Sequence, residues 1–550
     1  MKNKFTNVSQ LISYQVTIQP DKVALLAQKQ SWLNFLLLSS AKYESLTFEE
    51  IELRINHYAH TFIDNGLNAG DKILVFIKPG LEFPIIIFSL FRAGIIPVFI
   101  DPGMGVDSML QCIQSANAKA IIGIPKIHHL RLLKPSAFSG IEISFVVGGR
   151  AINAMSFENI LKKTNATHAF ESSTSIENLA AILFTSGGTG TPKGVQYTHE
   201  MFIEQALRLK QLFRLAYQDR DYPCFPLFGL FSLSLGLTVY MPEVDLMKPA
   251  QANAKAIIKS LQKHRITFAT GSPALWNRVA QYALRKKITL PHLKAIATFG
   301  APVSIALHAD LSKVIIHGEV YTPYGATECL PVSCTSSREI LGETKLETLK
   351  GLGTCVGYAA PQTEIQILDL EKNIISEEVD IIGEILVSSK TRTTGYEGLE
   401  DFSQNAVYTC PETQKIFHRM GDLGKLDRFG RLWFLGRKVH GIRLDNFWLC
   451  TEEIEPVVNN LAEVKRCALI KLKDKVTLVI ERQDGMVDLP SHEKDKFFQK
   501  IRIALSQLPK GHLVDEFILD MNFPVDTRHN IKIDRLSMAA TLNQKSLSFL

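Results

Sequence analysis

Residues 183–195 read Leu-Phe-Thr-Ser-Gly-Gly-Thr-Gly-Thr-Pro-Lys-Gly-Val, so a β-like apolar run passes directly into a loop rich in glycine and hydroxyl groups. Glycine lets backbone N–H groups approach an anion without interference from a Cβ atom, and the hydroxyl groups add hydrogen-bond donors. The lysine adds a point charge. The residues predicted to bind phosphate are Thr185, Ser186, Gly187, Gly188, Thr189, Gly190 and Lys193.

The spacing of this loop excludes two common nucleotide-binding motifs. A Walker A loop needs Gly-x-x-x-x-Gly-Lys followed at once by Ser or Thr, and dinucleotide binding needs Gly-x-Gly-x-x-Gly. Neither pattern occurs over residues 183–195. The loop therefore predicts a different nucleotide enzyme, with a flexible surface turn as the alternative if the loop is considered alone.

The composition bounds the protein class. At 550 residues the chain is too long for one hydrophobic core, so at least two folding units are expected. With 46% hydrophobic and 21% charged residues, it has the composition of a soluble globular protein. The net charge of +6 is spread without a run of Lys and Arg, so we expect no nucleic-acid partner and no polybasic membrane patch.

Cysteine usage and hydropathy indicate the compartment. The eight cysteines form no Cys-x-x-Cys pair and no cluster with histidine, which argues against a zinc site or a disulfide framework and favours a reducing cytoplasm. The N-terminus shows no apolar signal core. The most apolar region, 83–100, is interrupted by Arg92, Gly94 and Pro97, so it predicts a buried helix running into a strand and no transmembrane segment.

Helical patterns alternate with short β-rich runs over the first 180 residues, and the rhythm returns after residue 200. This alternation predicts an α/β fold with a mostly parallel, helix-covered sheet. The expected helices span 48–66, 81–93 and 106–116, and the expected strands span 72–77, 120–124, 266–269 and 295–298.

The pattern changes to shorter strands from about residue 355, which favours a small antiparallel or barrel-like subdomain with strands at 364–368 and 383–387. A boundary is predicted near Gly436, dividing the chain into domains 1–436 and 437–550. The second domain is expected to be a small α+β unit. Its elements would be a helix from about Thr451, strands at 465–471 and 476–481, and a helix over 492–507.

Two further segments carry candidate nucleotide-binding residues. Residues 321–328 read Tyr-Thr-Pro-Tyr-Gly-Ala-Thr-Glu, which predicts a rigid turn, or alternatively a strand-to-turn corner with a buried Tyr. There Tyr324 can cover a purine, Thr327 can donate to a phosphate, and Glu328 can hold Mg²⁺, which prefers oxygen ligands shared with phosphates. Asp422 is expected on a loop leading into a hairpin, where it can accept from ribose hydroxyls.

Taken in order, these segments resemble the acyl-adenylate-forming superfamily, which includes acyl-CoA synthetases, peptide-synthetase adenylation domains and luciferases. The resemblance spans essentially the whole chain. It implies a large N-terminal domain that binds ATP and a carboxylic acid, and a small mobile C-terminal domain that brings in a catalytic lysine. It rests on the loop 185–194, Gly300-Ala-Pro302, Tyr324-Gly-Ala-Thr-Glu328, Gly421-Asp422, Gly436-Arg437 and Lys532.

The resemblance also implies a role for each matching residue. Lys532 would be the catalytic lysine, and the loop from Thr185 to Lys193 would hold the β- and γ-phosphates. The remaining implied contacts are Gly300, Ala301, Pro302, Tyr324 and Gly325 for adenine, Thr327 for the α-phosphate, Glu328 for Mg²⁺, and Asp422 with Arg437 for the ribose.

A narrower resemblance is to the β-lactone synthetases of bacterial long-chain olefin biosynthesis. It implies adenylation of a 2-alkyl-3-hydroxy fatty acid, followed by closure of a β-lactone by the substrate's own hydroxyl, without CoA. It also implies association with enzymes that make and decarboxylate the lactone, and peripheral contact with a membrane. The segments that carry it are 225–231, 248–252, 271–275, 324–332, 418–422 and 523–530.

Three departures from the acyl-CoA synthetases bear on this resemblance. Val439 stands where those enzymes have a polar hinge residue, and Asn446 stands where a glycine lets the pantetheine chain approach. Gly188 replaces a hydroxyl residue that is common in the phosphate loop. The first two favour an enzyme that does not use CoA, and the third puts a side-chain phosphate contact in doubt.

Alternatives remain for function and for individual residues. The chain could be a fatty acyl-CoA or acyl-AMP ligase, or a non-catalytic nucleotide- or lipid-binding descendant of the fold. His199, His418 and His440 are candidates for the base that deprotonates the hydroxyl, although each is typical of a structural histidine. Two alkyl pockets are predicted from apolar residues that core packing also explains: Phe228, Phe231, Leu235, Trp276 and Leu330.

Overall fold

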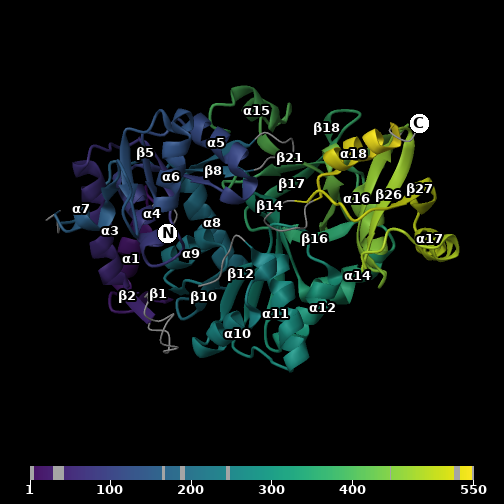
Figure 1. Ribbon diagram of the computed structural model, residues 1–550, viewed down its shortest axis with the longest axis horizontal. Helices are drawn as coiled ribbons and strands as arrows, with labels where there is room; N and C mark the ends of the chain where they lie inside the picture. The colour runs from purple at the N-terminus through teal and green to yellow at the C-terminus, as the bar shows by residue number, and fades with distance from the viewer. Residues whose placement is uncertain are drawn as a thin grey trace.

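The computed structural model describes residues 5–28, 43–163, 168–185, 192–242, 248–445, 447–525 and 533–547. Helices cover two large sheets along most of the chain, and a smaller α+β unit lies at the C-terminal end (Figure 1). The α/β fold class predicted from the alternating pattern is confirmed.

Within the described ranges, the smaller of the two large sheets has seven strands in the order β7-β6-β5-β3-β4-β8-β9. All neighbours are parallel except β9, which returns antiparallel to β8. The bounds are β3 Lys72–Phe76, β4 Ile96–Ile100, β5 Ala120–Gly123, β6 Ile143–Val146, β7 Met155–Ser156, β8 Leu179–Thr185 and β9 Lys193–Thr198. The associated helices are α3 Phe48–Asp64, α4 Glu82–Ala93, α5 Val106–Ser115, α6 Pro125–Leu133 and α7 Phe157–Leu161.

The three helices predicted in this region begin and end within two residues of the observed ones. Helix α3 begins at Phe48 because Thr47 and Glu50 form a capping box: the Thr47 hydroxyl accepts from the Glu50 N–H at 3.2 Å, and the Glu50 carboxylate accepts from the Thr47 N–H at 2.8 Å. Helix α4 is buried from Phe83 to Ala93 and is apolar along most of its length, and its buried Arg92 is paired with Glu52 at 2.6 Å. This confirms the predicted buried helix running into strand β4.

Fifteen strands of the described residues form the larger sheet, along the path β18-β17-β19-β21-β22-β16-β15-β14-β13-β12-β10-β11-β1-β2 with β20 beside β21. The part from β14 to β1 is parallel. The bounds there are β1 Val23–Gln28, β2 Tyr43–Thr47, β10 Arg220–Pro223, β11 Thr238–Tyr240, β12 Phe268–Gly271, β13 Ala295–Thr298 and β14 Glu319–Ala326. The helices are α1 Gln10–Ile18, α8 His199–Leu212, α9 Pro226–Ser234, α10 Ala254–Lys263, α11 Pro273–Lys286 and α12 Ile305–Val314.

From β15 onward the same sheet continues with antiparallel pairs, as predicted for the region after residue 355. The antiparallel β14–β15 ladder joins this part to the parallel part. The bounds are β15 Cys329–Ser336, β16 Thr354–Ala359, β17 Glu364–Asp369, β18 Ile374–Ile375, β19 Gly383–Ser388, β20 Val407–Thr409, β21 Ile416–Leu426 and β22 Leu432–Arg437, with helices α13 Ser337–Glu339, α14 Lys345–Leu349 and α15 Glu400–Asn405.

The C-terminal unit packs around a sheet of its own (Figure 1, yellow-green). Two hydrophobic clusters lie on it, one made of residues between Ile442 and Val514 and the other of residues between Ala468 and Leu542. Separate cores are the expected property of a second domain, although the boundary at 436/437 itself stays a prediction. The elements are β23 Ile442–Leu444, β24 Phe447–Leu449, α16 Thr451–Asn459, β25 Val464–Leu472, β26 Lys475–Arg482, α17 Ser491–Leu505, β27 Glu516–Leu519 and α18 Arg535–Leu547.

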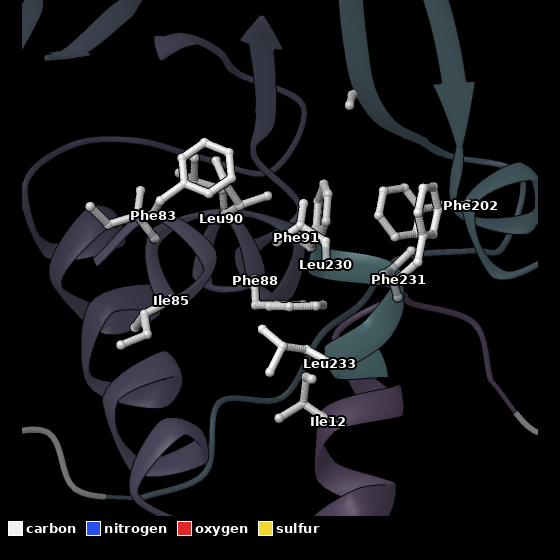
Figure 2. Close-up of a cluster of buried hydrophobic side chains, with 14 of the residues drawn as sticks. Ile12, Phe83, Ile85, Phe88, Leu90, Phe91, Phe202, Leu230, Phe231 and Leu233 are labelled. Atoms are coloured by element: carbon white, nitrogen blue, oxygen red, sulfur yellow. The ribbon is translucent and has the colours of Figure 1, made fainter. Parts of the chain in front are cut away.

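An aromatic core joins the two large sheets. Figure 2 shows Phe88 and Phe91 of α4 between Phe83 on one side and the α8 and α9 residues Phe202 and Phe231 on the other. The ring of Phe202 lies 5.5 Å from that of Phe91 and 4.5 Å from that of Phe231. Edge-on and tilted contacts of this kind add to the burial energy and hold the two sheets in a fixed relation.

Two predictions about the chain as a whole have structural answers. All eight cysteines are free thiols. No helix within the described ranges is both long enough and apolar enough to span a membrane.

Candidate active site

One large cleft receives the carboxyl ends of parallel strands from both sheets. Its volume is about 4020 Å³, and its wall continues onto residues of the C-terminal unit. Crevices at the carboxyl ends of parallel strands are the usual ligand sites of open α/β sheets. The predicted site residues that line it are Thr185, Lys193, Gly300, Ala301, Pro302, Tyr324, Gly325, Thr327, Glu328, Asp422 and Arg437.

Several predicted site residues lie outside the described residues. These are Ser186, Gly187, Gly188, Thr189 and Gly190 of the phosphate loop, together with Lys532. The described neighbours of these residues do line the cleft: Thr185 and Lys193 flank the loop, and Ile533 follows the lysine.

Tyr324, Asp422 and Arg437 form a hydrogen-bonded, charged group on one wall. The Tyr324 hydroxyl donates to Asp422 Oδ2 at 2.6 Å, and Arg437 Nη1 lies 3.1 Å from Asp422 Oδ1. Asp422 stands opposite Arg437 in the ladder between β21 and β22, so the register of two strands fixes the ion pair. The prediction that placed Asp422 on a loop was wrong, because the residue lies inside strand β21. For residues 321–328 the structure shows the alternative, a strand-to-turn corner: Tyr324 lies in β14, which ends at Ala326, and the turn follows.

Burial dominates the electrostatics of this group. It raises the pKa of Asp422 above its ordinary value, and the Arg437 guanidinium opposes that rise. Burial together with the Asp422 carboxylate raises the pKa of Tyr324 well above its ordinary value. The same carboxylate raises the pKa of Arg437. Near neutral pH, Tyr324 therefore keeps its proton and acts as a donor, and Arg437 stays charged.

Two glycines let the backbone come close to the cleft. Gly300 has φ of +93°, a conformation that other residues adopt only with strain. A Cβ atom on Gly325 would lie 2.6 Å from the carbonyl oxygen of Cys329. The predicted adenine-binding segments thus present bare backbone to the cleft, because a side chain at either position meets strain or a steric clash.

The turn between β14 and β15 carries Thr327 and Glu328, and three hydrogen bonds hold it. The Tyr197 hydroxyl donates to the Thr327 carbonyl at 2.7 Å, and the Thr393 N–H donates to the Glu328 carbonyl at 2.7 Å. The Tyr396 hydroxyl donates to Glu328 Oε1 at 3.1 Å. A single carboxylate aimed into a cleft fits a Mg²⁺ ion that takes its other ligands from phosphates and water.

Lys193 lies beside two rings, with its Nζ 4.3 Å from the ring centroid of Phe402 and 5.3 Å from that of Tyr396. It begins strand β9, which pairs with β8 so that Lys193 stands opposite Thr185. This pairing brings the two described ends of the predicted phosphate loop together.

Sequence reasoning missed Tyr396, Phe402 and Glu384, which all line the cleft. Burial disfavours the charged form of Glu384, yet hydrogen bonds from Arg419 at 2.6 Å and Lys438 at 2.9 Å lower its pKa. These residues belong to no motif around the predicted site, since they come from segments far along the chain that only the fold brings to it.

The three candidate histidines are separated by the structure. His418 and His440 line the cleft, whereas His199 is buried away from it beside Phe91. Burial lowers the pKa of each to about 4, so all three are neutral and weakly basic near pH 7. A base with so low a pKa is poorly matched to proton transfer at neutral pH.

The predicted alkyl-pocket residues fall into two groups, those that line the cleft and those that are buried in the core. Phe228, Phe231 and Leu330 line the cleft. Trp276 is fully buried in the core beneath α11, and Leu235 is packed in the core that joins the sheets. Only the first three are placed to contact a ligand in this cleft.

Comparisons with known proteins agree with this geometry. A family described as AMP-binding enzyme matches residues 12–397. The chain is 32% identical to an olefin beta-lactone synthetase of Xanthomonas campestris pv. campestris, over 95% of this chain and 94% of that protein. It is 33% identical to an olefin beta-lactone synthetase of Stenotrophomonas maltophilia, over 90% and 91%. A long-chain-fatty-acid–CoA ligase of Yersinia pestis is 23% identical, over 79% and 80%.

Solved structures with low sequence identity share the fold. An anthranilate CoA ligase in complex with anthranoyl-AMP superposes with a TM-score of 0.79 at 16% identity, covering 99% of this chain and 98% of that chain. An amide bond synthetase from Marinactinospora thermotolerans gives 0.78 at 17% identity, covering 97% and 99%.

Proposed function

This chain belongs to the AMP-binding enzyme family and is an ATP-dependent adenylate-forming ligase, and we propose that it converts a long-chain 2-alkyl-3-hydroxy fatty acid into a β-lactone. The observation that carries the proposal is the similarity to olefin beta-lactone synthetases over almost the full length of both chains. The Yersinia pestis ligase is less similar over a shorter part. The products would be the lactone, AMP and pyrophosphate.

ATP would lie along the cleft with its adenosine at the β14–β22 wall. Tyr324, with Gly300 and Gly325, would face the adenine, and Asp422 with Arg437 would bind the ribose hydroxyls. The pairing of Asp422 with Arg437 supports this role, because the carboxylate at the cleft wall is held by one hydroxyl donor and one ion pair. The phosphates would then extend toward Thr327, Glu328 and Lys193, which line the same cleft.

In the first half-reaction a carboxylate oxygen of the substrate attacks the α-phosphorus, and the bond to pyrophosphate breaks. Both reactants are anionic, so cationic groups and oriented donors must stabilise the charge that develops. A Mg²⁺ ion on Glu328 would supply a Lewis acid shared with the phosphates. Lys193 carries the charge that this chain itself brings from strand β9.

In the second half-reaction the substrate's 3-hydroxyl oxygen attacks its own acyl carbon, AMP leaves, and the hydroxyl proton passes to a base or to solvent. Holding the hydroxyl against the acyl carbon replaces a bimolecular encounter with an intramolecular one. Effective molarities of roughly 10⁵ M or more are available to well-oriented groups, and the strain of a four-membered ring offsets part of this. The main task of the protein is to fold the substrate.

The C-terminal unit would move during the reaction. We propose that residues 437–550 form a mobile domain and that Lys532 enters the cleft for adenylate formation. Support comes from the separate cores of this unit and from Ile533, Asp534 and Arg535, which line the cleft directly after the lysine. Val439 is 52% exposed and also lines the cleft, so an apolar side chain stands where acyl-CoA synthetases have a polar hinge residue.

The proposal extends to the setting of the enzyme. A product with two long alkyl chains is nearly insoluble in water, so transfer to enzymes that consume it, or to a membrane surface, would follow. We propose a cytoplasmic enzyme that works beside the other enzymes of olefin biosynthesis.

The test is to incubate the purified protein with Mg·ATP and a synthetic 2-alkyl-3-hydroxy fatty acid, with and without CoA, and to identify the organic product by NMR. A β-lactone formed at the same rate with and without CoA is expected. A thioester that forms only with CoA would instead assign the protein to the fatty acyl-CoA ligases, the class of its more distant relative. An acyl-AMP that accumulates without closing would indicate an acyl-AMP ligase.

A further inference from the structure

The cleft has a second apolar wall, on the side of the smaller sheet. Its residues follow the carboxyl ends of parallel strands: Phe83 after β3, Met104 and Met109 after β4, and Ile127 and Leu130 after β5. None of the residues assigned to ATP comes from these segments. This part of the cleft is therefore surface that nucleotide binding does not use.

The first apolar wall lies on helix α9 and its surroundings, where Leu227, Phe228 and Phe231 line the cleft. Figure 2 shows one residue of each wall, Phe83 on one side and Phe231 on the other, with Phe88 and Phe91 between them. Both walls belong to one continuous cleft. A ligand with two apolar branches can therefore occupy both walls of the same cleft, whereas a single chain is suited to one.

The second wall also reaches the protein surface. Leu133 at the end of α6 and Val106 at the start of α5 line the cleft, and they are 76% and 55% exposed. Apolar side chains at a cleft mouth are costly to leave in water unless an apolar ligand or surface covers them. Met104 and Met109 deeper in the wall have flexible side chains that adapt to chains of different shape.

We propose that the wall formed by Phe83, Met104, Met109, Ile127 and Leu130 binds one of the two alkyl chains of the substrate, and that the α9 wall binds the other. This inference rests on the proposed function, since it requires a substrate with alkyl branches at both carbon 2 and carbon 3. It moves one of the two alkyl pockets away from the residues from which the sequence predicted both: Phe228, Phe231, Leu235, Trp276 and Leu330.

The test uses two matched variants and four substrates. Leu130 and Leu227 are both half-buried and both line the cleft, one on each wall, so Leu130→Trp and Leu227→Trp fill the two walls equally. The four substrates are 3-hydroxy acids. The first carries long alkyl chains at carbon 2 and carbon 3, the second has methyl in place of the chain at carbon 2, the third has methyl in place of the chain at carbon 3, and the fourth has methyl at both. The measurement is kcat/KM for AMP release, with lactone identified by NMR.

A tryptophan that displaces two or more methylenes from a wall lowers kcat/KM at least 10-fold, since each buried methylene contributes about 4-fold. With the substrate that carries two long chains, Leu130→Trp is expected to show this loss of kcat/KM. The loss should disappear when the alkyl chain that binds the Leu130 wall is cut to methyl. Leu227→Trp is expected to lose its penalty when the other chain is cut. A variant that matches the wild-type rate on the doubly cut acid is folded. If Leu130→Trp fails this check, Met104→Trp tests the same wall.

The outcomes separate the two proposals. If the wild-type enzyme makes lactone but the penalty of Leu130→Trp and Met104→Trp is absent, or does not depend on chain length, the second alkyl site is overturned while the proposed function stands. If the wild-type enzyme makes no lactone from any of the four acids, the proposed function itself fails.

Discussion

The two polar ends of the cleft differ in how the protein holds them. At the proposed adenosine end, Tyr324, Asp422 and Arg437 come from three strands of one sheet, and their contacts bury a carboxylate that is 3% exposed. At the proposed phosphate end, Glu328 stands on a turn and takes one hydroxyl donor, while Lys193 lies over a ring. The first group is part of the fold as well as of the site, whereas the second is free to exchange its contacts for a ligand.

The largest expected effect is at the phosphate end, and it concerns rate alone. Glu328→Gln keeps the shape but removes the charge that would hold Mg²⁺, so adenylation is expected to fall on the order of 10²-fold or more. The melting temperature should move by less than about 2 °C, because the carboxylate is half-buried and has one hydrogen-bond partner among its described neighbours. Pyrophosphate release measures the adenylation rate, and differential scanning fluorimetry measures the melting temperature. A variant that melts far below the wild type would show that Glu328 is structural.

A matched pair of substitutions tests the comparison directly. Tyr324→Phe and Tyr396→Phe each remove one hydroxyl that donates to a carboxylate, at 2.6 Å and 3.1 Å. Tyr324→Phe is expected to cost about 2 kcal/mol of unfolding free energy, because it leaves the buried Asp422 oxygen without that donor. Tyr396→Phe should cost less than about 1 kcal/mol, since water can replace the hydroxyl beside half-buried Glu328. Equal losses in urea titrations would contradict the distinction.

A smaller effect concerns pH. Burial raises the pKa of Asp422, so the folded protein binds this proton more tightly than the unfolded chain does. The contribution of Asp422 to stability is therefore greatest below the unfolded value near 3.8 and declines as the pH rises through the raised native value. Asp422→Asn removes that decline, so between pH 4 and pH 7 its unfolding free energy should fall less than that of the wild type. Parallel pH curves for the two proteins would be the contrary result.

Sequence reasoning predicted elements correctly where local sequence signals determine the structure. It failed where the register between paired strands determines it. Helix α3 was predicted at its observed start from its amphipathic pattern, and the structure shows that the capping box of Thr47 and Glu50 begins it there. Asp422 was misplaced because the flanking Gly421 and Gly424 resemble a turn, whereas the pairing with Arg437 across β21 and β22 keeps the segment extended. No local sequence pattern predicts such a cross-strand pair.

The site residues that sequence reasoning missed were missed for the same reason. Tyr396 reaches Glu328 from a segment 68 residues away, and Phe402 reaches Lys193 from one still further from that lysine. Such contacts depend on how β9, β14 and the segment before α15 meet in space. The motif residues were found because a resemblance to a family supplied what the pattern alone did not.

The smallest expected effect is at His418, which lines the cleft. Burial holds the pKa of His418 near 4, so the ring is neutral throughout the range in which the enzyme would work. Its contribution to stability is present above the unfolded value of about 6.5 and is lost as the pH falls toward 4. His418→Gln should leave the pH dependence of lactone formation between pH 5.5 and 8 unchanged, with rates within about 3-fold of the wild type. An acid limb that shifts in the variant would mean that His418 titrates during turnover and takes the hydroxyl proton after all.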